Sequence, residues 1–168
     1  MARSSAPSQI SYGPLTAPWT HALELFRFAG AAAPPTEQIG SGWAGRDGER
    51  VCGALLGERD GSSAMLHGPV VVTPPDAAPE TALEVAAELL ANALRHAEEN
   101  GIDTVFTRPQ GLDKIWVRYG FIPLPEAELP KGLRGRPGVG LYGWRGGTAL
   151  WSAAGRNAAA RVRAGARR

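Results

Sequence analysis

The most informative stretch of the chain is Ile115-Trp116-Val117-Arg118-Tyr119-Gly120-Phe121-Ile122-Pro123-Leu124-Pro125. It predicts a short helix that presents Ile115 and Tyr119 on one side, four residues apart. Gly120 predicts the end of that helix, because glycine accepts the left-handed conformation found after a last helical turn. The residues from Phe121 predict a strand at a sheet edge, since Pro123 has no amide hydrogen to donate to a neighbour.

A three-strand meander and a long amphipathic helix are predicted before this stretch. Asp47-Gly48 and Asp60-Gly61 are hairpin turn signals. From Pro79 to Asn100, apolar residues recur at helical spacing. The order of elements indicates an α/β domain with a mixed sheet. We expect strands at 10–15, 39–44, 50–56, 63–72, 102–107, 121–124 and 139–144, and helices at 20–28, 79–100 and 112–119.

Length and composition predict one globular domain within the 168 residues. We expect a flexible lead-in at 1–9, the domain at 10–147, and a flexible basic tail rich in Ala and Arg at 148–168. The one cysteine, Cys52, excludes an internal disulfide and a cysteine cluster for zinc. Apolar runs fall short of a membrane span, and the first residues lack the apolar segment of a secretion signal. These features favour a cytoplasmic protein that neither enters nor spans a membrane.

Charge is divided unevenly along the chain. Residues 1–130 carry 9 Lys/Arg and 16 Asp/Glu, a net −7, whereas residues 131–168 carry 9 Lys/Arg and no acid, a net +9. A basic arm of this kind can contact nucleic acid electrostatically. It lacks the aromatic residues that stack on bases, so a solvated tail is the simpler interpretation. We expect nucleic-acid contact, if any, through this tail alone.

The order of elements, the segment Tyr119-Gly120-Phe121 and Val51-x-Gly53 in the middle strand resemble the GCN5-related N-acetyltransferase (GNAT) superfamily over residues 8–146. The resemblance implies a GNAT-like mixed, mostly antiparallel, splayed sheet flanked by helices. It also implies direct acyl transfer to a small amine, with acetyl-CoA or another acyl-CoA as cosubstrate. A homodimer is one arrangement that we consider, and the sequence leaves the oligomeric state open.

In the GNAT family, a loop of pattern R/Q-x-x-G-x-G/A before the long helix holds the pyrophosphate of acyl-CoA with backbone amides. The matching residues are Ala77-Ala78-Pro79-Glu80-Thr81-Ala82, of which only Ala82 fits. Pro79 removes one donor, and the carboxylate of Glu80 competes with phosphate for the positive helix end. The resemblance assigns CoA binding to this loop and to the end of the preceding strand. The candidate residues are Val70, Val71, Val72, Ala77, Ala78, Thr81 and Ala82.

Two residues are candidates for proton transfer. Many family members carry a tyrosine acid four residues before the glycine, where this chain has Trp116. Indole cannot deliver a proton at neutral pH, so Tyr119 is the substitute candidate, with a packing role as its alternative. His67 lies in the strand that reaches the cleft in this fold and is the candidate general base. A hydrogen-bonded structural histidine is the alternative, and Gly68-Pro69 predicts a bulge beside it.

The loop after the predicted strand 102–107 and the motifs missing from the chain complete the sequence analysis. Arg108 either meets an anionic substrate or pairs with a surface acid, and Asp113 is expected to cap the short helix. Sequence patterns of serine hydrolases, zinc proteases and P-loop enzymes are missing, and no metal is expected.

The leading interpretation is an N-acyltransferase. Its alternative is a catalytically inactive GNAT-fold module that binds or regulates.

Overall fold

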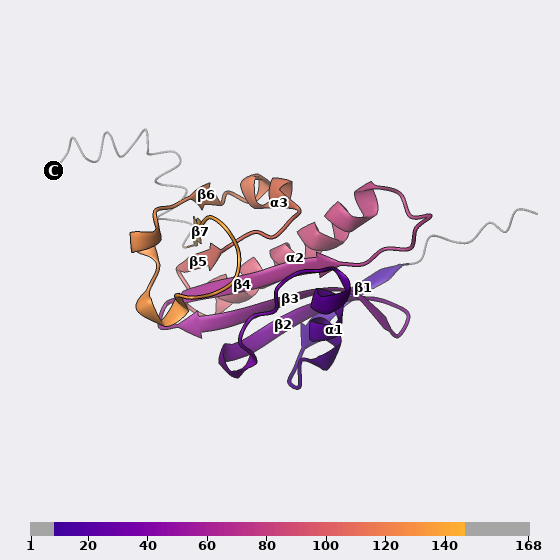
Figure 1. Ribbon diagram of the computed structural model, residues 1–168, viewed down its shortest axis with the longest axis horizontal. Coiled ribbons are helices and arrows are strands. Elements are labelled where there is room, and N and C mark those ends of the chain that lie inside the picture. The colour runs from indigo at the N-terminus through magenta and orange to yellow at the C-terminus, as the bar shows by residue number, and fades with distance from the viewer. Residues whose placement is uncertain (1–8, 147–168) are drawn as a thin grey trace, which may run out of the picture.

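A computed structural model describes residues 9–146 as a seven-stranded sheet with three α-helices (Figure 1). Residues 1–8 and 147–168 lie outside this range, so the predicted basic tail and nearly all of the predicted lead-in are not described. In chain order the elements are β1 (Ile10–Leu15), α1 (Thr20–Phe28), β2 (Ile39–Asp47), β3 (Arg50–Asp60), β4 (Ser63–Val71), α2 (Glu80–Glu99), β5 (Thr104–Thr107), α3 (Asp113–Arg118), β6 (Ile122–Pro123) and β7 (Tyr142–Arg145).

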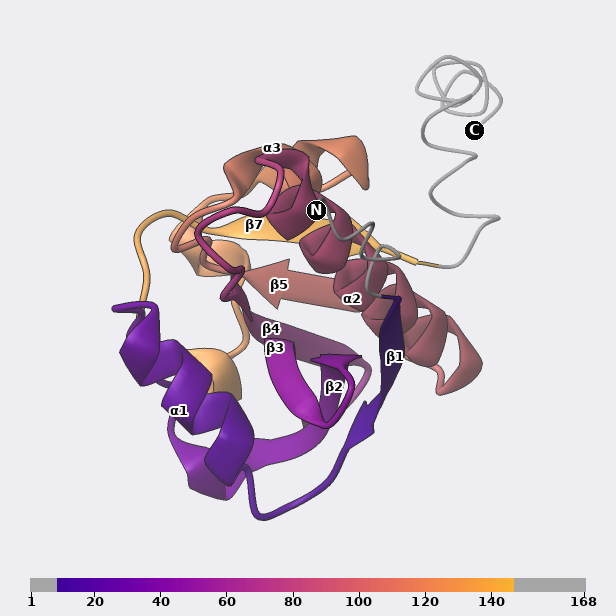
Figure 2. The same ribbon diagram turned by 90° about the vertical axis from the view of Figure 1, so that its right-hand side faces the viewer.

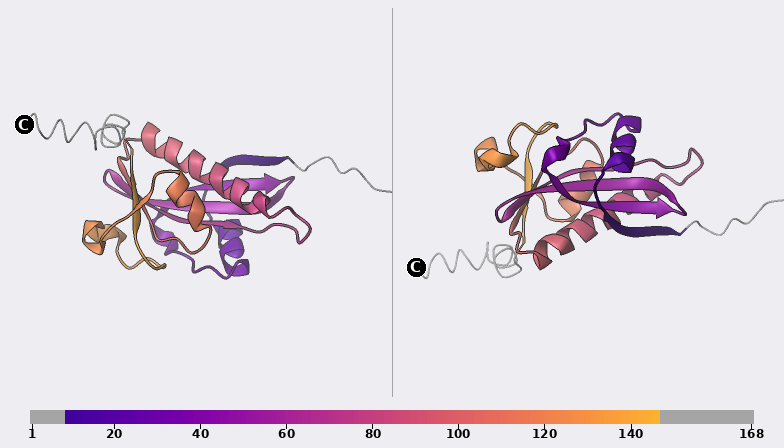
Figure 3. Two further views of the ribbon diagram at one scale, coloured as in Figure 1. Left: turned by 90° about the horizontal axis from the view of Figure 1, so that it is seen from above. Right: turned by 90° about the horizontal axis from the view of Figure 1, so that it is seen from below.

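The sheet has the strand order β1-β2-β3-β4-β5-β7-β6. Only β4 and β5 pair in parallel, and the other neighbours are antiparallel. Helix α2 covers one face and α1 the opposite face (Figure 3). Helix α3 packs with α2, because Ile115 and Trp116 belong to the core beneath both helices. The predicted mixed, mostly antiparallel α/β fold is therefore confirmed.

Both predicted hairpin turns are confirmed. Gly48 and Gly61 adopt φ values of 65° and 63°, which glycine accepts without steric cost. The predicted strands 39–44 and 50–56 were too short, since β2 continues to Asp47 and β3 to Asp60. β3 continues through Glu58, whose side chain is buried inside the fold rather than exposed as a charged side chain usually is.

The boundaries of the later strands also differ from prediction. The strand expected from Ile102 begins at Thr104, and the one expected from Val139 begins at Tyr142. Val139 is 89% exposed and lies between two glycines with positive φ, Gly138 and Gly140. Such a backbone cannot extend a strand ladder, so the apolar side chain of Val139 gave a misleading signal.

The helix, stop and strand predicted around Gly120 are confirmed. Gly120 has a φ of 88°, its amide donates to Val117, and the amide of Phe121 donates to Trp116. These two bonds form a Schellman motif, which satisfies carbonyls at the end of α3. Pro123 lies in the edge strand β6, as its missing donor requires.

Two core layers hold the helices on the sheet. On the α2 face, β3 approaches the helix so closely that a Cβ added at Gly53 would lie 2.7 Å from Val85 Cγ1. On the α1 face, Phe26 is fully buried against Leu56 and neighbouring residues. Within the described residues, no helix has both the length and the apolar character needed to cross a membrane.

Candidate active site

The sheet opens between β4 and β5 after four residue pairs. Pairing runs from Ser63 opposite Thr104 to Leu66 opposite Thr107, and there it ends. The Thr107 hydroxyl donates a hydrogen bond of 3.1 Å to the Leu66 carbonyl. β4 continues beyond this point to Val71, with β3 on one side and, among residues 9–146, no strand partner on the other. Figure 2 shows β5 and β7 on one side of β4, with β3 and β2 on the other.

A bulge lies in β4 beside this opening. Leu56 of β3 pairs with His67 and Ala54 pairs with Val70, so β4 carries one residue more than β3 over the same span. Gly68 within the bulge has a φ of 101°. A bulge bends its strand and redirects the backbone that follows. The bulge predicted from Gly68-Pro69 is therefore confirmed.

Val70, Val71 and Val72 lie at the end of β4, and only the Val71 amide faces the open edge of the strand. The Val72 amide donates to the Cys52 carbonyl at 2.8 Å and is thus directed toward β3. Successive residues in a strand direct their backbone groups to opposite sides. The Val71 amide therefore faces the open edge, while the Val72 amide is occupied.

The loop predicted to hold phosphate has both free and occupied amides. The Ala77 amide donates to Pro74, and the Thr81 amide donates to Ala78. No hydrogen bond to a described residue is made by the amides of Ala78, Glu80 and Ala82. Helix α2 begins at Glu80, so its carboxylate lies at the positive end of the helix dipole. Three amides and one competing carboxylate thus meet at this helix start.

His67 lies at the point where β4 and β5 separate, and it belongs to a buried charged network. His67 is 4% exposed, and its Nε2 lies 2.7 Å from Oε2 of Glu58, which is 3% exposed. Arg136, from the connection between β6 and β7, donates to both carboxylate oxygens of Glu58 at 2.7 Å. Arg136 also donates to the carbonyls of Gly132 and Arg134, which fixes the guanidinium to its own loop.

The environment of Glu58 favours its charged form. Burial alone raises the pKa of a carboxyl, but hydrogen bonds from Arg136 and His67 outweigh it and lower the pKa of Glu58 from 4.5 to about 2. Glu58 was not among the residues singled out from the sequence, because its partner Arg136 lies 78 positions away. No local pattern connects the two.

Comparison with known proteins adds evidence on the fold. No family model matches the sequence, and a search of curated proteins finds no match. An acetyltransferase of the GNAT family from Staphylococcus aureus matches with a TM-score of 0.63 and 12% identity, over 82% of this chain and 99% of that chain. The ribosomal-protein-S18-alanine N-acetyltransferase from Escherichia coli matches with a TM-score of 0.60 and 13% identity, over 82% of this chain and 94% of that chain.

A third match is a longer protein. N-acetylglutamate synthase from Neisseria gonorrhoeae, complexed with coenzyme A and N-acetyl-glutamate, matches with a TM-score of 0.60 and 14% identity, over 84% of this chain but 36% of that chain. The strand order, the opening beside β4 and these matches agree. The chain has the GNAT fold.

In this GNAT fold, Trp116 and Tyr119 lie at the end of α3. Trp116 is fully buried, packs edge-on against Phe121, and its Nε1 has no hydrogen-bond partner among the described residues. Tyr119 is half-buried against the core beneath α2 and α3. The proton-donor role predicted for Tyr119 stays a prediction, and its packing role is visible. The short helix begins at Asp113, directly after Leu112.

Two pockets flank the end of β4. One of about 500 Å³ lies beside the loop at the start of α2 and is lined by Ala77, Thr81 and Arg50. Asp47, Asp76 and Glu84 also line it, so one guanidinium and three carboxylates contribute to the wall of this pocket. Arg50 is a cation near the predicted phosphate loop that the sequence analysis did not single out.

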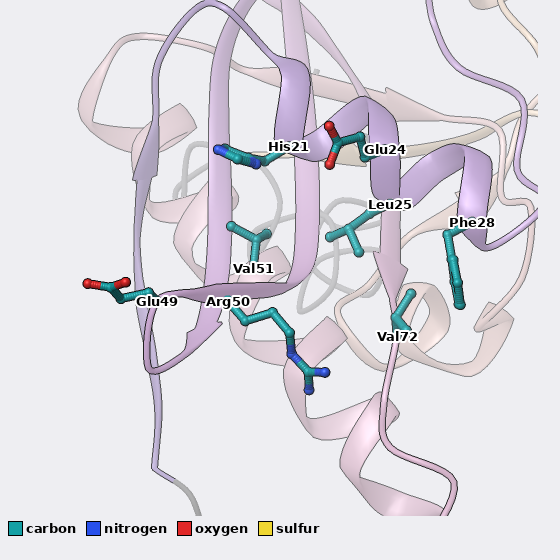
Figure 4. Close-up of a pocket in the computed structure, with 8 residues that line it drawn as sticks. All are labelled: His21, Glu24, Leu25, Phe28, Glu49, Arg50, Val51 and Val72. Atoms are coloured by element: carbon teal, nitrogen blue, oxygen red, sulfur yellow. The ribbon is translucent and has the colours of Figure 1, made fainter.

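The other pocket, of about 460 Å³, lies between α1 and the hairpin that joins β2 to β3 (Figure 4). His21, Glu24, Leu25 and Phe28 line it from α1, and Val72 lines it from the end of β4. Its polar groups come from both walls, since Glu49 and Arg50 line the hairpin side. The pocket therefore lies on the α1 face of the sheet and reaches Val72, just beyond the end of β4.

The residues after β5 are tied to other parts of the fold. Arg108 donates two hydrogen bonds to the carboxylate of Glu126, whose side chain is 64% exposed. Of the two roles weighed for Arg108, the structure shows the pair with a surface acid. Gln110 exchanges two hydrogen bonds with the backbone of Ala32, which joins the loop after α1 to the loop after β5. Among residues 9–146, no cluster of three His, Cys, Asp or Glu side chains is placed to hold a metal ion.

Proposed function

We propose that this chain is an N-acyltransferase that moves an acyl group from acyl-CoA directly to a small amine. The observation that carries the proposal is the edge of β4 from His67 to Val71 that no strand of residues 9–146 covers, with its bulge and the Val71 amide directed away from β3. An extended acyl-pantetheine chain could take the place of the missing strand along this edge. The proposal therefore depends on the opening beside β4 and not on the fold alone.

The cosubstrate supplies a thioester, whose carbonyl carbon is open to attack by an amine. The Val71 amide is the donor suited to the thioester oxygen, and such a preorganised donor stabilises the charge that develops during attack. Val70 and Val72 line the same strand end on the α1 face. Ala77, Ala78, Thr81 and Ala82 form the candidate phosphate loop, in which the amides of Ala78 and Ala82 are available.

The transfer needs one proton to leave and one to arrive. The amine nitrogen attacks the carbonyl carbon, a C–N bond forms, the C–S bond breaks, and the CoA thiolate departs. The amine proton passes to His67, directly or through a water molecule. Tyr119 or solvent returns a proton to the thiolate, because the indole of Trp116 cannot.

The rival function is a GNAT-fold module that binds or regulates without catalysis. It is favoured by Glu80, which stands at the helix start where a phosphate would bind, and by the three carboxylates that line the same pocket as Arg50. Like charges at such a site oppose a polyphosphate ligand. The acyltransferase proposal requires the free amides at the start of α2 to outweigh this repulsion.

Calorimetric titration of the protein with acetyl-CoA at low salt tests the proposal, with desphospho-CoA as the comparison. We expect micromolar binding, and turnover of at least one amine in a screen that follows thiol release. Binding of neither acetyl-CoA nor longer acyl-CoAs would exclude the acyltransferase. Binding without turnover of any amine would favour the regulatory module.

A further inference from the structure

Three side chains from distant parts of the sequence meet at one buried carboxylate. Glu58 comes from β3, His67 from β4 and Arg136 from the connection before β7. Every polar contact between them measures 2.7 Å, and the side chains of Glu58 and His67 are 2% and 3% exposed. Burying charged groups is costly unless they are fully paired. Here each charged group has a partner at hydrogen-bond distance, so the cluster holds its side chains in one fixed arrangement, which an exposed ion pair does not do.

We propose that Glu58 is a positioning residue for His67: its carboxylate keeps the imidazole proton on Nε2 and so leaves Nδ1 as the atom that accepts the amine proton. The inference rests on the proposed acyltransferase function. A carboxylate only accepts hydrogen bonds, so the Nε2 atom 2.7 Å from it must be the donor. A neutral imidazole carries a single N–H, and the other ring nitrogen then has a free lone pair.

Arg136 makes this arrangement rigid. Its Nε and Nη2 atoms each bond one oxygen of Glu58, a bidentate contact that fixes the plane of the carboxylate. With the carboxylate fixed, the direction of the Nε2–H bond is also fixed. The charged groups that the structure brings to this imidazole are the Glu58 carboxylate and, behind it, the Arg136 guanidinium.

The position of His67 makes its orientation relevant to the reaction. His67 follows Leu66, the last residue of β4 paired with β5, so it lies at the point where the sheet opens. The bulge begins at the next residue. A base at this point must present an acceptor atom in a defined direction, and a carboxylate behind the imidazole is an effective way to select the tautomer.

Nitrogen NMR of the full-length protein with ¹⁵N-labelled histidine tests the inference directly. The measurement is made well above neutral pH, where an ordinary histidine is neutral. Signals of His67 are assigned by their loss in His67→Gln. We expect the Nε2–H tautomer in the wild type, and a mixture of tautomers in Glu58→Gln, whose amide can both donate and accept. An Nδ1–H tautomer in the wild type would overturn the inference, even if Glu58→Gln failed to fold.

Kinetics separate this role from a purely structural one. For Glu58→Gln, we expect kcat to fall about tenfold or more, as expected when general-base catalysis is impaired, while the KM for acetyl-CoA changes little. Glu126→Gln, which breaks the exposed carboxylate pair with Arg108, is the control and should leave both constants unchanged. Equal losses in both variants, or an unchanged kcat in Glu58→Gln, would refute the positioning role.

The two proposals fail in different ways. If the wild type has the Nε2–H tautomer but acylates no amine, the acyltransferase proposal is wrong, and with it the catalytic role of this pair. If the wild type is active but has the Nδ1–H tautomer, the acyltransferase proposal stands and the role of Glu58 is refuted.

Discussion

At the scale of single residues, the pKa of Glu58 links the buried network to stability. The folded-state pKa of about 2 lies below the ordinary 4.5, so the network stabilises the fold above pH 4.5 and this stabilisation is lost as pH falls toward 2. The difference between the two values corresponds to about 3 kcal/mol. We expect urea unfolding to show a loss of this order between pH 5 and pH 2, and a much flatter profile in Glu58→Gln.

A matched variant controls this prediction. Glu126 also pairs with an arginine, but its side chain is 64% exposed and its pair is open to solvent. Glu126→Gln should therefore leave the pH dependence of unfolding close to that of the wild type. A wild-type profile that is flat below pH 5 would contradict the assigned pKa of Glu58.

Glu80 allows a second residue-scale prediction, on the candidate phosphate loop. Because its carboxylate lies at the positive end of α2, we expect Glu80→Gln to bind acetyl-CoA about two- to fivefold more tightly. Glu88→Gln, two turns further along the helix, should have little effect, since the helix dipole acts mainly within the first turn. Calorimetry measures both. Unchanged affinity in Glu80→Gln would mean that phosphate does not bind at this helix start.

The sequence predicts the bulge of the candidate site and singles out His67 beside it, but it does not reveal the partners of His67, for a physical reason. His67 is a candidate and Gly68-Pro69 a predicted bulge because a titratable residue beside a strand-bending pair is a local signal, and of these the bulge is confirmed. Glu58 and Arg136 are ordinary surface residues by local pattern, and only the fold brings them together across 78 positions. The ionised, buried state of Glu58 is a property of the pair, which a linear sequence does not display.

At the scale of elements, the close approach of β3 to α2 predicts sensitivity at Gly53. A Cβ at this position would lie 2.7 Å from Val85 Cγ1 and 3.1 Å from Leu89 Cδ1, both on the helix. We expect Gly53→Ala to destabilise the protein by about 1–3 kcal/mol through overpacking, measured by urea unfolding.

Gly13→Ala in β1 is the control for overpacking, because a Cβ there would have nothing within 4 Å. Its effect should stay within about 0.5 kcal/mol. Equal effects of the two substitutions would show that β3 and α2 are not held at this distance in solution.

Element types were more predictable than element ends. The two Asp-Gly turns and the helix stop at Gly120 depend on glycine backbone freedom, which the sequence states directly, and all three are confirmed. The end of β3 was missed because burial of Glu58 depends on Arg136 from a distant loop. The start of β7 was missed because the exposed Val139 resembles a strand residue.

At the scale of the whole molecule, the uneven charge affects how an anionic ligand approaches. Residues 1–130 carry a net −7, and the nine Lys and Arg residues of 131–168 bring the full chain to +2. Acyl-CoA carries several phosphate charges, so its approach to the first part alone would be opposed. If the chain binds acyl-CoA as proposed, the basic C-terminal residues should assist the encounter electrostatically.

Deletion of residues 152–168 tests this effect, because it removes five arginines and changes the net charge from +2 to −3. We expect the association rate of acetyl-CoA, measured by stopped flow, to fall several-fold at low salt in the shortened chain. At about 0.5 M salt, where the Debye length is only a few ångströms, the two chains should have the same rate. Desphospho-CoA, with less charge, should show a smaller difference. Equal rates at every salt concentration would mean that these arginines do not act on the site. If only the full chain, and not the shortened one, bound duplex DNA in a salt-sensitive manner, the arginines would instead be assigned to nucleic-acid binding.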